Sequence, residues 1–170
     1  MPLSKFFLSG TWNPTGSSPE FGIWALIIGT LKITVIATIV AVPIGLGAAI
    51  YLNEYASDRS RRIIKPILEI LAGIPTIVFG FFALTFVTPI LRNLIPNLGE
   101  FNSISPGIVV GIMIVPMITS MSEDAMSSVP DKIREGAFGL GATKFEVATK
   151  VVLPAATSGV VASIVLGISC

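Results

Sequence analysis

The sequence predicts an all-α fold, a multi-spanning transmembrane helical bundle with about four spans. Two observations support this prediction. Hydrophobic residues make up 52% of the 170 residues and charged residues only 12%, with a mean hydropathy of +0.86. A soluble domain of this size leaves too much of its surface exposed to hide so much apolar material. The few charges are also absent from four stretches that are each about as long as a bilayer's hydrocarbon core is thick.

These stretches set the expected boundaries, with spans at about 33–52, 66–91, 104–121 and 151–170. Residues 21–170 would then form the transmembrane domain, preceded by a polar segment 1–20 and interrupted by a polar segment 122–150. Lys32 lies just before the first span, because a lysine at the bilayer centre costs about 2.5–3.5 kcal/mol. Residues 21–31 would follow the outer interface, anchored by Trp24. The alternative is that Lys32 is a cation lining an anion pathway.

Lysine and arginine set the orientation, because cytoplasmic loops carry an excess of them. Two segments are basic, one after the first predicted span (Arg59, Arg61, Arg62 and Lys65) and one within 122–150 (Lys132, Arg134, Lys144 and Lys150). Both would face the cytoplasm, and segment 1–20 would be external. We therefore expect a multi-pass protein of the cytoplasmic membrane, in contact with lipid. An external polar start without a signal sequence, and an end at Cys170 inside an apolar run, suggest an internal piece of a longer chain.

Segment 122–150 has the pattern of a small folded element. Ser128 is expected to cap a helix with Pro130 in its first turn. Ile133, Ala137 and Leu140 recur at helical spacing and would form one apolar face of this helix. Gly139 and Gly141 would end it.

A second helix follows in the same segment. Thr143 and Glu146 have the spacing of a capping box. This helix is expected to continue directly into the span that begins at Val151, as a rigid rod between the cytoplasm and the membrane.

The residues Glu135-Gly136-Ala137, Gly141 and Val151-x-Leu153-Pro154 resemble the EAA motif of ABC importer permeases, with Gly136 and Val151 as mild departures. The resemblance implies that the first of these helices is a cytoplasmic coupling helix, which docks on a separate ATP-binding subunit. The coupling residues it implies are Glu135, Gly136, Ala137, Leu140, Gly141, Ala142, Leu153 and Pro154.

A second resemblance concerns the substrate. Residues 68–80, LEILAGIPTIVFG, are similar to a segment of the phosphate permease pair, and WNP at 12–14 favours the PstC-type subunit. This implies a permease for inorganic phosphate, with a second, PstA-type permease subunit and an external phosphate-binding protein as partners. The family continues beyond the last helix into an Arg and then Gly-Glu-Thr.

Within the second predicted span, four residues are candidates for a substrate pathway. A glycine or proline there could unwind the helix and turn backbone amides toward an anion, as discontinuous helices do in other transporters. The candidates are Gly73, Pro75, Thr76 and Gly80.

Several functions are not favoured. GLGATK at 139–144 lacks the P-loop spacing, so ATP hydrolysis is expected on a partner, with no cofactor on this chain. With no histidine and one cysteine, we expect neither a metal site nor catalytic residues, and without a basic block no nucleic-acid partner. Two alternatives stay open: an EAA-motif permease for another oxyanion such as sulfate or molybdate, and an ATP-independent channel or structural membrane subunit.

Overall fold

The computed structural model describes residues 10, 12–13, 20–95, 99 and 102–169. Most of the predicted external segment 1–20 therefore lies outside the described residues. The all-α class is confirmed, with one antiparallel pair of two-residue strands before the helices. The elements are β1 (Trp12–Asn13), β2 (Glu20–Phe21), α2 (Ile23–Glu54), α3 (Asp58–Ala72), α4 (Thr76–Phe82), η1 (Ala83–Val87, a π-helix), α5 (Thr88–Leu94), α6 (Ile104–Ser127), α7 (Asp131–Gly139), α8 (Lys144–Val147), η2 (Ala148–Val152, a π-helix), α9 (Leu153–Ala155) and α10 (Thr157–Ser169).

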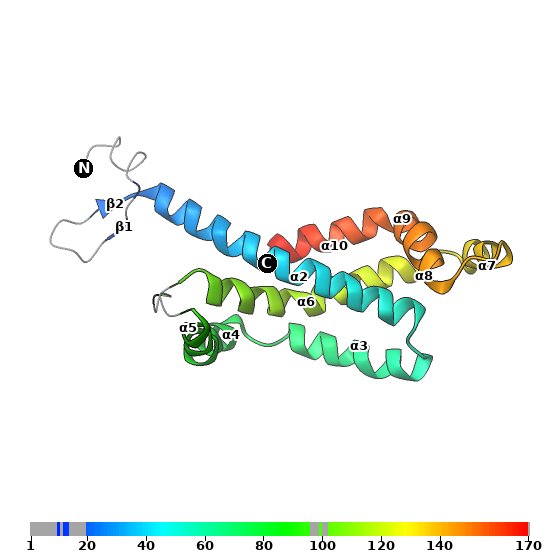
Figure 1. Ribbon diagram of the computed structural model, residues 1–170, viewed down its shortest axis with the longest axis horizontal. Coiled ribbons are helices and arrows are strands. Elements are labelled where there is room, and N and C mark those ends of the chain that lie inside the picture. The colour runs from blue at the N-terminus through cyan, green and yellow to red at the C-terminus, as the bar shows by residue number, and fades with distance from the viewer. Residues whose placement is uncertain (1–9, 11, 14–19, 96–98, 100–101, 170) are drawn as a thin grey trace.

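The helices form an elongated bundle (Figure 1). Helices α2, α6 and α10 run side by side, and α3 lies along the other side of α6. The β1–β2 pair is at one end of the bundle, and α7 and α8 are at the opposite end.

Small residues bring α2 and α6 close together. Every fourth position of α2 is small and buried, over Ala37, Ala41, Gly45 and Ala49. On α6, a Cβ added at Gly111 would come within 2.9 Å of a Val40 side-chain carbon. Thr119 donates a buried hydrogen bond of 3.1 Å to the Gly45 carbonyl. Small residues and interhelical hydrogen bonds of this kind hold membrane helices together where no hydrophobic driving force acts between them.

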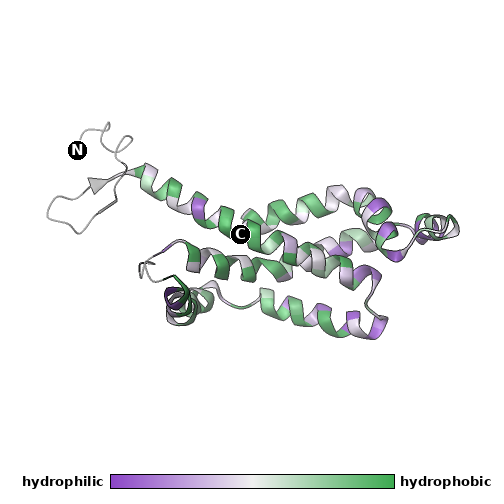
Figure 2. Ribbon diagram, viewed as in Figure 1, coloured by the Kyte–Doolittle hydropathy of each residue, from purple (hydrophilic) through white to green (hydrophobic). Residues whose placement is uncertain are grey.

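Three helical runs of the described residues are long and apolar enough to cross a membrane: α2, Thr76–Leu94 and α6. A fourth exists if the bent pair Lys144–Ala155 and Thr157–Ser169 is one span. Apolar residues follow the bundle helices, and hydrophilic residues gather at the α7–α8 end (Figure 2).

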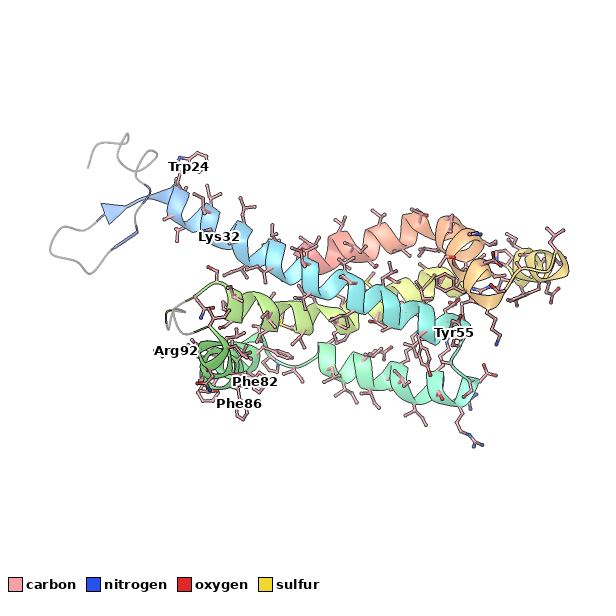
Figure 3. The ribbon with its side chains drawn as sticks, in the orientation of Figure 1. Trp24, Lys32, Tyr55, Phe82, Phe86 and Arg92 are labelled. Atoms are coloured by element: carbon pink, nitrogen blue, oxygen red, sulfur yellow. The ribbon has the colours of Figure 1, made fainter. Side chains whose placement is uncertain are left out.

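The first predicted span differs from the structure at its start. Residues 23–31 are not a separate interfacial segment, because α2 is one helix of 32 residues from Ile23 to Glu54. At about 1.5 Å per residue it is about 48 Å long, well beyond the hydrocarbon thickness of about 30 Å. Lys32 is exposed and, with Trp24, lies on the half of α2 toward the β1–β2 end, while Tyr55 follows the other end (Figure 3).

The second predicted span, 66–91, is not one helix. The chain leaves helical structure between α3 and α4, at Gly73, Ile74 and Pro75. Proline lacks an N–H and disfavours helical backbone in the residue before it, which explains a break at this point. A second irregularity follows at η1, which ends two residues before Pro89. The Thr88 hydroxyl, just after η1, donates to the Ala83 carbonyl at 2.9 Å.

The polar segment was predicted to begin at residue 122, but α6 continues to Ser127. Ser128 ends α6 instead of starting α7. Its N–H donates to the Asp124 carbonyl at 3.1 Å and its hydroxyl to the Ala125 carbonyl at 2.7 Å. The prediction of Ser128 as a helix N-cap was therefore wrong, and Pro130 directly precedes α7.

The expected rigid rod into the last span is also wrong. The run Lys144–Ala155 and α10 meet at an angle of 76°. Pro154 removes one backbone donor before the bend. The Thr157 hydroxyl donates to the carbonyls of Leu153 (3.0 Å) and Pro154 (2.7 Å), which stabilises the bend.

Candidate functional site

The two basic segments of the sequence meet at one end of the bundle, here called the basic end. It comprises the C-terminal ends of α2 and α6, the start of α3, and α7 and α8 (Figure 1). The predicted orientation requires these segments to lie on one side of the membrane, and their arrangement in space agrees with it. The segment from Pro130 to Thr143, here called the tip, extends from this end.

Helix α7 ends in a Schellman motif. Gly141 has a φ of 84°, which favours glycine over any residue with a side chain. Its N–H donates to the Phe138 carbonyl at 2.9 Å, and the N–H of Ala142 donates to the Ala137 carbonyl at 3.2 Å. These bonds satisfy carbonyls that the helix end would leave unpaired. The predicted glycine turn is therefore present.

The capping box at the start of α8 is also present. Thr143 accepts from the Glu146 N–H at 3.4 Å, and Glu146 accepts from the Thr143 N–H at 3.1 Å. Lys150 adds an ion pair to Glu146 at 3.2 Å. This reciprocal bonding fixes the direction in which the chain leaves the tip and enters α8.

Much of the tip surface is exposed and apolar. Leu140 is 91% exposed, and Ile133 and Phe138 on α7 are also exposed. Phe145, just after the tip on α8, is exposed as well. Glu135 and Gly136 are exposed beside them. Such clusters of exposed large apolar side chains, mixed with charge, are typical of surfaces that bind another protein.

The predicted apolar face of Ile133, Ala137 and Leu140 is divided by the structure. Ala137 packs against a core cluster made of the buried residues Ala49, Met126, Val129, Val147, Val152, Ala156 and Val160. Ile133 and Leu140 are exposed. Helix α7 thus presents one narrow face to the bundle and most of its circumference outward.

The eight predicted coupling residues fall into two groups. Those at the tip surface, together with Pro154 at the distant bend, are exposed: Glu135, Gly136, Leu140, Gly141 and Pro154. The others pack against the core cluster: Ala137, Ala142 and Leu153. The exposed residues other than Pro154 thus all belong to the tip, and the other three pack against the core cluster.

Arg134 was counted in the sequence only as a cytoplasmic charge. In the structure it contacts the ends of α2 and α6: it pairs with Glu54 and donates to Asn53 Oδ1 at 3.0 Å and to the Met126 carbonyl at 2.7 Å. Glu54 is 80 residues away in the chain. No local pattern in the sequence indicates such a contact.

A second buried ion-pair cluster joins α3 to α6. The Glu123 side chain is 1% exposed and contacts Arg61 and Lys65, the latter at 3.2 Å, and Lys65 also pairs with Asp124. Of the charged residues of α3, only Arg61 and Lys65 are partly buried, on the same face as Ile64 and Leu68. The exposed surface of α3 carries both charged and apolar side chains: Asp58, Arg59, Arg62, Ile63, Ile67, Glu69 and Ile70.

The predicted pathway residues are at and after the break between α3 and α4. Gly73 caps the end of α3 and Pro75 precedes α4. Thr76 and Gly80 line a cavity of about 320 Å³ against α6, with Phe79, Ala83, Pro106, Val109, Val110 and Met113. All eight lining residues are uncharged, and Gly80 is helical and does not unwind the chain.

Comparison with known proteins identifies the family. Residues 41–169 match the family described as "Binding-protein-dependent transport system inner membrane component". The chain belongs to this family. Its members are transport components, so the prediction of a non-enzymatic, multi-pass protein of the cytoplasmic membrane is confirmed.

Three relatives that are similar to this chain are all named as permease proteins. "Probable ABC transporter permease protein YqgH" of Bacillus subtilis is 38% identical over 97% of this chain and 53% of its own length. "Phosphate transport system permease protein PstC" is 36% identical in Haemophilus influenzae and 37% in Pasteurella multocida, over 96% of this chain and 58% and 57% of those proteins. The chain thus spans little more than half the length of these relatives.

A solved structure supports the fold. One chain of "Inward facing conformations of the MetNI methionine ABC transporter" has a TM-score of 0.66 and 21% identity, covering 86% of this chain and 71% of that one. At this identity the likeness concerns the fold alone.

Proposed function

We propose that this chain forms part of the membrane-spanning permease of an ATP-driven importer for inorganic phosphate. In this account the tip docks on a separate ATP-binding subunit, and ATP binding there moves the spans between outward-open and inward-open arrangements. An external phosphate-binding protein delivers the substrate, and a second, PstA-type permease subunit completes the pathway.

The proposal that this chain couples to an ATP-binding subunit rests on the structure of the tip. The path of the chain out of the tip is fixed by two adjacent local structures, the Schellman motif at Gly141 and the capping box at Thr143. The apolar side chains of the tip, Leu140 above all, are exposed to receive a partner. Exposed apolar side chains of this kind, rimmed by charged residues, mark an interaction site.

The substrate part is supported by the relatives named as phosphate transport permeases, and by the segment at residues 68–80. The cavity beside Thr76 and Gly80 contains no cation among its lining residues, so it does not by itself favour an anion. We keep Gly73, Pro75, Thr76 and Gly80 as the proposed pathway residues of this chain, because hydroxyls and backbone amides can face an anion without a cation beside them.

Uptake of radiolabelled phosphate by the energised importer, in the presence of excess unlabelled anions, tests the substrate assignment. We expect unlabelled phosphate to abolish uptake of the label, and sulfate and molybdate to leave it unchanged. Competition by sulfate or molybdate as strong as that by phosphate would instead support a permease for another oxyanion. Uptake that continues without ATP would support a channel and contradict the proposal.

Gly141→Asp and Glu135→Lys test the coupling part in the same assay. Gly141→Asp places a side chain on a backbone with φ of 84°, and Glu135→Lys reverses a charge on the exposed tip. Both should leave the chain in the membrane and reduce uptake. Normal uptake by both variants would contradict a role for the tip.

A further inference from the structure

Helix α7 has few connections to the rest of the bundle. Across Asp131–Gly139, only Arg134 and Ala137 are partly buried, and the other seven side chains or glycines are exposed. These two residues are three positions apart and therefore lie on the same face of the helix. Ala137 provides a small apolar contact with the core cluster, so Arg134 makes the polar attachment of α7 to the bundle.

The guanidinium group of Arg134 binds three acceptors at once. Its Nη1 pairs with Glu54, whose side chain is 6% exposed, and its Nη2 donates to Asn53 and to the Met126 carbonyl. The Arg134 side chain is itself only 14% exposed. A planar, permanently charged fork can bind several oxygen acceptors in fixed directions, which the compact ammonium group of lysine cannot do.

The acceptors belong to the ends of the two longest helices. Glu54 is the last residue of α2, and the Met126 carbonyl is in the last turn of α6. Helix C-termini carry unpaired carbonyls and a partial negative charge, so a single cation between them stabilises both. Because α2 and α6 pack on each other along their length, a group fixed to both ends moves with the pair.

From this geometry we infer that Arg134 is a positioning residue that transmits movement of α7 to α2 and α6. The inference rests on the proposed function, in which α7 docks on an ATP-binding subunit. Without Arg134, α7 would stay attached through its short connections to α6 and α8, and its exposed face would still dock. ATP hydrolysis would continue, but only part of a displacement of α7 would be transmitted to α2 and α6.

The variants must separate this role from simple instability. Removal of one partner of a buried ion pair leaves an uncompensated charge and destabilises a protein strongly, whereas removal of both is often tolerated. The main variant is therefore the double substitution Glu54→Gln with Arg134→Gln. Arg134→Lys keeps the charge but not the fork. Arg59→Gln removes an exposed cation at the basic end but outside the tip, on α3, and is the matched control.

The measurement is the number of phosphate ions imported per ATP hydrolysed by the complete importer in proteoliposomes. For the double variant we expect this ratio to fall about tenfold, within the range typical of coupling between sites, while co-purification of the ATP-binding subunit is unchanged. ATP hydrolysis should stay within about twofold of the unmodified importer, and Arg134→Lys should give an intermediate ratio. Arg59→Gln should match the unmodified importer.

Two results would overturn the inference while the proposed function stands. One is a double variant with the same ratio as Arg59→Gln. The other is a parallel loss of assembly, hydrolysis and transport, which is the sign of a purely structural role. Absence of ATP-dependent uptake in the unmodified importer would instead overturn the proposed function, and the inference with it.

Discussion

The structure predicts different effects of replacement by alanine at the three glycines of the tip. A Cβ added at Gly136, Gly139 or Gly141 would meet no atom within 4 Å, so alanine causes no steric clash at any of them. The positions differ in backbone conformation: Gly136 and Gly139 are helical, whereas Gly141 has a φ of 84°. The effects of alanine therefore report backbone energy alone.

The magnitudes follow from this difference. Inside a helix, alanine is more favourable than glycine by about 0.5–1 kcal/mol, so Gly136→Ala should stabilise α7 by that amount. In the left-handed region a residue with a side chain costs about 1–2 kcal/mol, so Gly141→Ala should destabilise the end of α7. Gly139 is the last residue of α7, where little helix remains to be stabilised, so Gly139→Ala should change the stability least.

Hydrogen–deuterium exchange of the amides of α7, followed by mass spectrometry in detergent, measures these local free energies. Gly136→Ala should slow exchange about two- to fivefold, and Gly141→Ala should speed it about five- to thirtyfold, since 1.4 kcal/mol corresponds to a factor of ten. Slower exchange in Gly141→Ala, or the same change in both variants, would refute the assignment of a left-handed glycine turn at the end of the tip.

Three further predictions concern the bundle and α8, the helix that follows the tip. Gly111→Leu should lower the stability of the detergent-solubilised protein by about 1–3 kcal/mol, because the added side chain overpacks against α2. Gly29→Leu, at a position where a Cβ has open space, should not lower it. Equal shifts of the melting temperature in the two variants would contradict the close packing. Glu123→Gln should cost about 1.5–3 kcal/mol, because Arg61 and Lys65, which are 34% and 30% exposed, lose a charged hydrogen-bond partner. Asp124→Asn, at a side chain 57% exposed, should cost less than about 1 kcal/mol. An equal loss of melting temperature in the two variants would argue against the buried cluster. Thr143→Ala should remove the cap of α8, at a cost of about 1 kcal/mol, and unchanged amide exchange across α8 would contradict it.

The parts of the fold that depend on local chemistry could be predicted from the sequence. The apolar stretches indicated the spans, because the thickness of a bilayer fixes the length of a helix that crosses it. The glycine turn at Gly141 and the capping box at Thr143 were predicted because each is formed by residues that are close in the chain. The interpretation of the tip as a coupling element rests on a resemblance and not on these local rules.

The errors have physical causes too. Glu123 and Asp124 suggested a polar loop, yet they are inside α6, because Arg61 and Lys65 from a distant segment neutralise them. A pattern read along one segment does not contain this partner. The unwinding considered at Gly73 and Pro75 is present as a break between α3 and α4, whereas the 76° bend after Pro154 was not foreseen. Prolines in membrane helices produce anything from a slight kink to a full break, depending on what replaces the lost hydrogen bonds.

The contacts of Arg134 were beyond any reading of the sequence. Its three acceptors come from residues 53, 54 and 126, and they become neighbours only when the ends of α2 and α6 meet. The same holds for the close approach of α2 to α6, in which Gly107 and Gly111 of α6 lie against Ile36 and Val40, each 71 residues earlier in the chain.

The central claim, that the tip docks on an ATP-binding subunit, is tested most directly by site-specific photo-crosslinking in cells. The photoreactive amino acid benzoylphenylalanine would replace Leu140, which is 91% exposed at the tip, and in a control Ile39, which is 67% exposed in the middle of α2. The account predicts a crosslink to the ATP-binding subunit from position 140 and none from position 39. A crosslink from neither position, or from both equally, would contradict docking through the tip.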